Sequence, residues 1–337
     1  MKAWRIKENS ISLDELEVEG VTDSCVKVKL LYCSAAVTDR LIAHGKIKAE
    51  LPIIPGRQAV GMVVETGAEV KNCVRGDTVS IKPLKMCGQC AKCADNKHAD
   101  CESPLVFGLT EDGFMRDFVT VSSDAVVKLP ERVAAKDAVF MDSIDICIEA
   151  VNKSGLDKGQ YLVICGATHL GIVMAQVAMY YQIVPILADI DPLYLQTAEE
   201  LGVYYTINSS EADTKKQVFM LTGGKLADAA AYMADSGYPF AHCLDFVKTG
   251  GSVVICGLEK SRADLTAPLC SVLNRRLNIH GITESNKHTL SAVNMLASKN
   301  VTVEPLIAAE IDFSAVGEEL KKEISPATVY FKTLVKM

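Results

Sequence analysis

Four cysteines lie close together in the stretch CGQCAKCADNKHADC, residues 87–101. Their spacing, C-x2-C-x2-C-x7-C, lets four thiolates from one loop surround a tetrahedral zinc ion at about 2.3 Å each. A site with four protein ligands has no open position for water or substrate, so such a zinc is structural. A redox or iron–sulfur function is the alternative. The predicted ligands are Cys87, Cys90, Cys93 and Cys101.

A second motif, GATHLG at residues 166–171, follows an apolar run and precedes a helical pattern. It matches G-x-G-x-x-G except at its second glycine. A helix N-terminus binds a pyrophosphate, and an acidic residue about 20 positions further on binds the ribose 2′-hydroxyl of NAD. An ordinary strand–helix turn with a capping Asp is the alternative. The predicted residues for NAD(H) are Gly166, Thr168, His169, Leu170, Gly171 and Asp189.

The pattern of expected secondary structure, which must position these groups, changes near residue 145. Short β-like runs with frequent turns come first, such as CVKVKLLYC, and are typical of an antiparallel barrel. Apolar runs then alternate with helical patterns, which predicts a parallel sheet covered by helices on both faces. The tail is strand-rich and returns to the first domain. We therefore predict a barrel domain, residues 1–145 and 287–337, and a doubly wound domain, residues 146–286.

Composition restricts the class of protein. The chain has 337 residues, is 49% hydrophobic and carries a net charge of -7, which is typical of a soluble protein with two domains. No basic run indicates nucleic acid as a partner, and no apolar N-terminal segment indicates secretion or a membrane. We expect a cytoplasmic protein with a small-molecule substrate. The cysteines outside the cluster are expected to be buried free thiols: Cys25, Cys33, Cys73, Cys147, Cys165, Cys243, Cys256 and Cys270.

The order of these motifs resembles that of the medium-chain dehydrogenase/reductase superfamily, in its zinc alcohol and polyol dehydrogenase branch. RGDTV at 75–79 is similar to the family's GD-x-V turn, and DGFMRDFVTV to its GGFAEY strand. The resemblance implies an α/β protein with a GroES-like β-barrel catalytic domain, a cysteine lobe at about residues 84–103, a Rossmann domain and a cleft between the domains. The family's first signature is carried by Gly56, Gly61, Gly67 and Val70.

The resemblance breaks down at the catalytic metal. Relatives hold a catalytic zinc with a Cys, a His and a later Cys, Glu or Asp. Here Ala36 stands at the Cys position and Arg57 at the His position, and Gln58 replaces the Glu that follows. Of the three ligand positions, only the one occupied by Asp142 still has a residue type that binds zinc in relatives. Because a catalytic zinc normally has three protein ligands, we predict one structural zinc per chain and no catalytic zinc.

Charged and polar side chains take the place of the metal ligands. Arg57 brings a cation whose N–H groups polarise a substrate oxygen, and the resemblance places Asp39 near enough to pair with it. Thr38 has the position of the family's proton-relay hydroxyl, and a histidine beyond it is suited to relay a proton near neutral pH. The alternative is a salt bridge that fills the metal position and a histidine that is merely solvated. The candidate catalytic residues are Arg57, Thr38, Asp39, Asp142 and His44.

Three functions stay open. The first is an NAD(H)-dependent oxidoreductase that acts on a small carbonyl or alcohol without catalytic zinc. The second is reduction of an activated C=C bond, the reaction of several superfamily members that lack zinc and are ene or quinone reductases. The third is a catalytically silent NAD-binding regulator or partner subunit.

The resemblance also implies an assembly. In the family the Rossmann sheet commonly continues across a two-fold axis through its last strand, and the candidate here is RRLNIHGI, residues 275–282. An exposed strand edge invites pairing, and a symmetric dimer satisfies it. We expect a homodimer or homotetramer.

Overall fold

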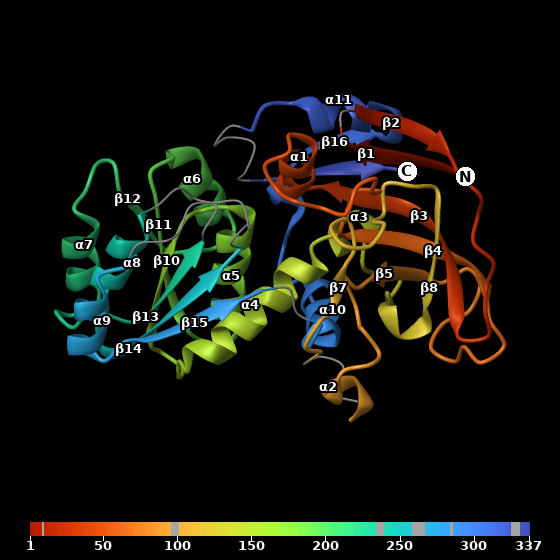
Figure 1. Ribbon diagram of the computed structural model, residues 1–337. Coiled ribbons are helices and arrows are strands. Elements are labelled where there is room, and N and C mark those ends of the chain that lie inside the picture. The colour runs from red at the N-terminus through yellow and green to blue at the C-terminus, as the bar shows by residue number, and fades with distance from the viewer. Residues whose placement is uncertain (9, 96–100, 234–238, 258–266, 284–285, 325–330) are drawn as a thin grey trace.

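The computed structural model describes residues 1–337 except 9, 96–100, 234–238, 258–266, 284–285 and 325–330. A mainly antiparallel sheet part, called the antiparallel part below, and an α/β part lie side by side, and both chain termini belong to the antiparallel part (Figure 1). Within the described residues, no helix has the length and apolar character needed to cross a bilayer.

The antiparallel part is built from strands at both ends of the chain. Its strands are β1 (Lys2–Lys7), β2 (Ser10–Glu15), β3 (Cys25–Ala35), β4 (Ala59–Thr66), β5 (Thr78–Ile81), β6 (Leu84–Lys85), β7 (Leu105–Val106), β8 (Phe118–Ser122), β9 (Val126–Lys128), β16 (Ile307–Asp312) and β17 (Lys332–Lys336). Its helices are α1 (Val37–Ala43), α2 (Ala91–Ala94), α3 (Ala135–Ala138) and α11 (Val316–Lys321).

The long strand β3 is the centre of this part. The main sheet has the order β16-β17-β3-β4-β5-β9, and β8 also pairs with β3. Alternate residues Val26, Val28 and Leu30 of β3 are buried, as expected for a strand with one face on a core. β17 pairs antiparallel with β3, with Thr333 opposite Ala35. The C-terminal strand therefore reaches the point where β3 ends and α1 begins.

The α/β part has the strand order of a doubly wound nucleotide-binding fold. Its strands are β10 (Tyr161–Cys165), β11 (Val184–Asp189), β12 (Tyr205–Asn208), β13 (Ala227–Met233), β14 (Val247–Cys256) and β15 (Asn278–Ile282). All neighbours are parallel, in the order β12-β11-β10-β13-β14-β15. This order reverses direction at β10, where such folds bind their ligands. The predicted combination of a barrel-like and a doubly wound domain is confirmed.

Helices cover both faces of the parallel sheet. They are α4 (Met141–Ser154), α5 (His169–Tyr180), α6 (Pro192–Glu200), α7 (Thr214–Leu221), α8 (Phe240–Asp245), α9 (Leu269–Arg275) and α10 (Thr289–Ala297). Along β10, Leu162 and Ile164 pack with α4, α5 and α6, whereas Val163 and Cys165 pack with α7 and α8. The continuous apolar run of β10 is thus explained by burial on both faces.

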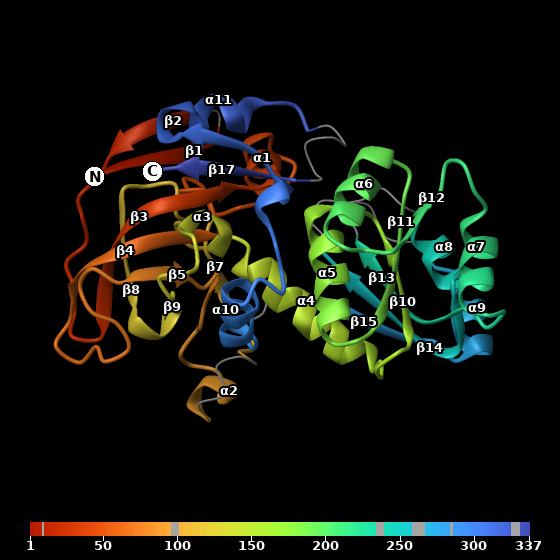
Figure 2. The same ribbon diagram turned by 180° about the vertical axis from the view of Figure 1, so that it is seen from behind.

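Helix α4 joins the two parts. It lies between them in both views (Figures 1 and 2), and it runs through the predicted boundary at residue 145. Its cap residue Phe140 and its first turn, which includes Asp142, lie on the barrel side of that boundary, and the helix packs on α5. The helix therefore belongs to the packing of the α/β part, while its first turn places Asp142 near the antiparallel part.

The outermost strand of the parallel sheet leads to a prediction on assembly. β15 pairs with β14 and stands at one end of the strand order, with Ile279 38% exposed. On the adjacent α9, Leu269 is 73% and Leu273 76% exposed. We expect light scattering at micromolar concentration to give at least twice the chain mass of 36.4 kDa, because pairing across this edge satisfies the strand's backbone groups. A monomer would contradict this assembly.

Candidate functional site

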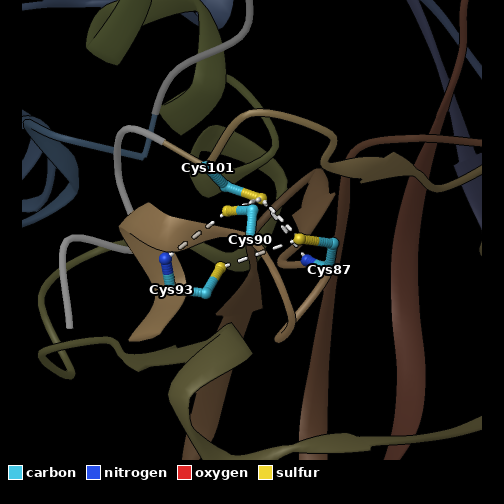
Figure 3. A group of neighbouring side chains, drawn as sticks. All are labelled: Cys87, Cys90, Cys93 and Cys101. Atoms are coloured by element: carbon cyan, nitrogen blue, oxygen red, sulfur yellow. Dashed lines mark hydrogen bonds between the residues drawn. The ribbon is translucent and has the colours of Figure 1, made fainter. Parts of the chain in front are cut away.

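The four cysteines of the zinc motif lie together in a lobe between β6 and β7 (Figure 3). Their Sγ atoms are 3.4 Å (Cys87 to Cys101), 3.9 Å (Cys87 to Cys93) and 4.0 Å (Cys90 to Cys101) apart. Sulfurs bound to one tetrahedral zinc at about 2.3 Å lie about 3.8 Å from each other, whereas a disulfide brings them to about 2.05 Å. The observed separations fit a shared metal ion.

The environment of these thiols also fits a cation. Backbone N–H groups of Glu102 and Cys93 lower the pKa of the Cys90 thiol to about 6, and that of Gln89 lowers the pKa of Cys87. Burial raises the pKa of Cys93 to about 12, and its neighbouring thiols add to this. Four thiolates at these distances repel one another unless a divalent ion holds them. The donor set fits a structural zinc.

The turn after β10 has the close packing that a dinucleotide site requires. Gly166 has a φ of +114°, and a Cβ on Gly171 would lie 1.9 Å from the Gly166 carbonyl oxygen. Only glycine fits at these two positions. Thr168, at the position of the missing glycine, is the N-cap of α5, and its hydroxyl accepts a hydrogen bond from the Gly171 N–H at 3.3 Å. The threonine therefore starts the helix whose first residues are His169 and Leu170.

Asp189 lies beside this turn at the end of β11. Its Oδ2 accepts the N–H of Ala167 at 2.6 Å, which ties the carboxylate to the turn. Its Oδ1 accepts the N–H groups of Ile190 and Asp191 at 2.7 and 3.0 Å. Asp191 has a different role, since its carboxylate caps α6 by accepting the N–H of Leu193 at 2.9 Å. Of the two acids, only Asp189 is shown to bond to the turn after β10.

The segment that carries Arg57 is held by close contacts on two sides. Gly56 has a φ of +94°, and a Cβ there would lie 2.7 Å from the Cys33 Sγ. Cys33 is fully buried, and burial raises its thiol pKa well above the ordinary value, so it packs as a neutral apolar residue. A Cβ on Gly108 would lie 3.1 Å from the Arg57 Cγ. The arginine stem is thus packed against the Gly108 loop.

Arg57 contacts Thr38 directly, since its Nη2 donates a hydrogen bond to the Thr38 Oγ1. The next residue, Asp39, is fully buried. It accepts the N–H of Ala36 at 2.8 Å and the N–H of Gly56 at 2.9 Å. Through these bonds Asp39 joins the start of α1 to the Arg57 segment. The structure therefore brings Arg57, Thr38 and Asp39 together.

Gln58 connects this group to Asp142 and to Lys332, a residue that the sequence analysis did not select. Its Nε2 donates to the Asp142 Oδ2 at 2.8 Å, and its Oε1 accepts a hydrogen bond from the Lys332 Nζ. Asp142 comes from the first turn of α4, and Lys332 is the first residue of β17. Three distant segments thus meet at one amide side chain.

Lys332 is a buried cation, with 6% of its surface exposed. Burial lowers the pKa of its ammonium to about 8; Asp142 acts against this shift and Arg57 adds to it. The Nζ lies 4.9 Å from the centroid of the Phe140 ring. Phe140 packs edge-on against His169, the first residue of α5, with 6.3 Å between ring centroids. The lysine is therefore linked through one aromatic ring to the turn described above.

His44 is not brought to this group. It is exposed at the C-terminal end of α1, and its Nε2 lies 3.2 Å from the backbone carbonyl oxygen of Lys322. Thr38 lies at the opposite end of the same helix. This placement agrees with the alternative of a solvated histidine, so His44 has no part in the mechanism proposed below.

Comparison with known proteins identifies both parts of the chain. Residues 22–131 match the family described as "Alcohol dehydrogenase GroES-like domain", and residues 170–299 match the family described as "Zinc-binding dehydrogenase". An alcohol dehydrogenase of Geobacillus stearothermophilus is 29% identical over 96% of this chain and 96% of its own length. An uncharacterized zinc-type alcohol dehydrogenase-like protein of Haemophilus influenzae is 28% identical over 79% of this chain and 77% of its own.

The fold is shared with solved dehydrogenases. A protein of Sinorhizobium meliloti 1021, described as a zinc-binding dehydrogenase and bound to NADP, superposes with a TM-score of 0.90 over 100% of this chain and 99% of its own. The sequence identity is 22%, so this likeness concerns the fold.

Proposed function

The chain belongs to the medium-chain dehydrogenase/reductase superfamily, and from this premise we propose that it transfers hydride between NAD(H) and a small carbonyl or alcohol with Arg57 in place of a catalytic zinc. The coarser conclusion, an NAD(P)-dependent oxidoreductase of the alcohol dehydrogenase type, follows from the family. The choice of NAD, the substrate class and the role of Arg57 are the proposal.

The residues after β10 fit a dinucleotide. Gly166 and Gly171 allow the close approach of backbone, and the positive dipole end of α5 favours a pyrophosphate at its N-terminus. When bound, the nicotinamide supplies or accepts the hydride. We assign the ribose 2′-hydroxyl to Asp189, and the bond between its carboxylate and the Ala167 N–H at the turn supports this assignment.

We predict that the protein binds NADH at least about tenfold more tightly than NADPH. Two like charges about 4 Å apart repel by roughly 4 kcal/mol near a protein surface, and about 1.4 kcal/mol already gives a factor of ten. Fluorescence titration with both nucleotides measures the ratio, and Asp189→Asn should reduce it. Asp191→Asn is the matched control, because that carboxylate caps α6. If Asp191→Asn loses the preference for NADH and Asp189→Asn keeps it, then Asp191 recognises the ribose.

The main support for the proposed role of Arg57 is its hydrogen bond to Thr38. Its guanidinium donates to Thr38, the residue at the family's proton-relay position, and it does so at the point where relatives place a metal-binding histidine. A guanidinium has five N–H donors in a rigid fork, so it is able to hold Thr38 and a substrate oxygen together. Such donors stabilise the negative charge that develops on that oxygen.

A second candidate is reduction of an activated C=C bond. Conjugate reduction also requires stabilisation of an oxyanion, but it does not require a metal-bound alkoxide. A catalytically silent NAD-binding subunit is the third. NADH consumption over a panel of aldehydes, ketones, enals and quinones separates them. Turnover with aldehydes or ketones supports the proposal, turnover restricted to enals or quinones supports the second candidate, and NADH binding without any turnover supports the third.

A further inference from the structure

Arg57 is suited to stabilise charge on a substrate oxygen but not to supply a proton. Arginine stays protonated in proteins, so it attracts a developing oxyanion without losing its own hydrogen. Reduction of a carbonyl to an alcohol nevertheless requires one proton besides the hydride. Thr38 accepts a hydrogen bond from Arg57 and has no low pKa of its own as a hydroxyl, and His44 lies at the far end of α1.

We propose that Lys332 exchanges this proton and is the acid–base residue of the site. The inference rests on the function proposed above. In the direction of reduction, the carbonyl carbon gains a hydride from a reduced nicotinamide dinucleotide, and the carbonyl oxygen takes a proton from the Lys332 Nζ. An alcohol forms, the lysine is left as a neutral amine, and solvent restores its proton. In the direction of oxidation, the neutral amine takes the hydroxyl proton.

The position of Lys332 supports this role. The pairing of β17 with β3 brings it to the end of β3, next to the start of α1 where Thr38 lies. Its Nζ donates to Gln58, the residue after Arg57. The Nζ also lies 4.9 Å from the centroid of the Phe140 ring, which packs edge-on against His169 at the N-terminus of α5. The amine therefore contacts both the residue next to Arg57 and the aromatic ring that packs on the predicted cofactor turn, and hydride and proton transfer require these two groups to be close together.

The charges around Lys332 come from four segments. Asp142 faces it from α4 and favours its protonated form, Arg57 disfavours that form, and the Cys33 thiol of β3 is a neutral neighbour at ordinary pH. Asp39 of α1 accepts the Gly56 N–H, and its charge raises the pKa of the Cys33 thiol. Since burial is the largest influence and lowers the lysine pKa to about 8, both protonation states are populated near neutral pH, as an acid–base residue requires.

The sign of the pH dependence follows from this pKa. The ammonium predominates below about pH 8 and the amine above it. The turnover rate of carbonyl reduction, which consumes the ammonium's proton, should therefore fall above about pH 8. The rate of alcohol oxidation, which needs the amine, should rise over the same range.

The first test measures the protonation of Lys332 without turnover. Protein grown with lysine labelled at the ε carbon with ¹³C is titrated by NMR, and the Lys332→Met variant identifies the signal by its loss. We expect that signal to shift with a midpoint near pH 8, and Asp142→Asn to lower the midpoint, because Asp142 holds the pKa up. A midpoint at the ordinary lysine value, above about pH 10, would overturn the inference.

The second test measures kcat against pH for three variants. Lys332→Met should lower kcat at pH 7 by about 10²-fold and remove the break near pH 8. Lys332→Arg keeps the charge and supports folding, but it should also lose the break, since a guanidinium does not exchange its proton in this range. Lys336→Met, on the exposed end of the same strand, is the control and should leave the profile unchanged.

The outcomes separate this inference from the proposed function. If the wild-type protein turns over carbonyls and the break near pH 8 persists in Lys332→Arg, then Lys332 is a structural residue and the function stands. If no substrate is turned over while the NMR midpoint lies near pH 8, then the proposed function fails and Lys332 loses its acid–base role with it.

Discussion

Replacement of Arg57 by lysine is expected to lower kcat by about 10²–10³, the usual effect of removing one oxyanion donor. Lysine keeps the positive charge but lacks the planar fork that allows a guanidinium to contact Thr38 and a substrate oxygen together. Arg57→Met should lose as much activity. The NADH dissociation constant and the melting temperature should change little, because the arginine stem is packed on Gly108 and a methionine fills similar space. Steady-state kinetics, fluorescence titration and thermal unfolding measure the three quantities.

Arg75→Lys is a matched control, because Arg75 is an exposed arginine in the turn before β5. It should leave kcat unchanged. A different result at Arg57 would identify a structural salt bridge: a melting temperature far below that of the wild-type protein, with normal turnover by the fraction that stays folded. Loss of one partner of a buried ion pair typically costs about 3–5 kcal/mol, which thermal unfolding readily detects.

The charges of the substituted residues agree with a rebuilt site. Compared with the ligand set that the family resemblance implies, Ala36 removes a thiolate, Arg57 adds a cation to a neutral position and Gln58 removes a carboxylate. Each change raises the side-chain charge by one unit, so the three together exceed by one unit the two positive charges that a zinc ion would bring. The double variant Ala36→Cys with Arg57→His tests this in reverse. Together with Asp142 it restores three ligand types, and it should bind a second zinc.

Removal of the zinc from the cysteine lobe is the other change with a large expected effect. Elemental analysis should find one zinc per chain, and Cys101→Ala should lose it, because three ligands of the tetrahedral set remain. Structural zinc contributes about 10–16 kcal/mol in zinc-finger peptides. We therefore expect the lobe between β6 and β7 to unfold locally, with a lower melting temperature and faster proteolysis between residues 84 and 103.

The exposed Cys270 provides the control for this experiment, since it lies outside the lobe on α9. Cys270→Ala should keep its zinc and its melting temperature. Two zinc ions per wild-type chain would contradict the prediction in a specific way, because the second ion would occupy the position assigned to Arg57. Zinc-free wild-type protein with an intact lobe would support the redox alternative for the four cysteines.

Much of this description was available from the sequence because the features concerned are local. Cys87 to Cys101 form one loop, so their spacing alone restricts the geometry of a metal site. Gly166 and Gly171 belong to one strand–turn–helix unit, and the periodicity of the flanking runs predicted that unit. The family resemblance of the glycine-containing segment marked Arg57 as standing where relatives have a metal-binding histidine. Chain periodicity and neighbouring residues determine such features before distant parts of the chain meet.

The tertiary structure decided which distant residues complete the site. Lys332 and Gln58 are 274 residues apart, and nothing near Lys332 distinguishes it from the exposed Lys336 on the same strand. The pairing of β17 with β3 makes the contact, and that register depends on the whole sheet. The same holds for Asp39, whose carboxylate accepts the N–H of Gly56 as well as that of Ala36 and so joins α1 to the Arg57 segment. Contacts of this kind arise from long-range packing, which local sequence patterns do not encode.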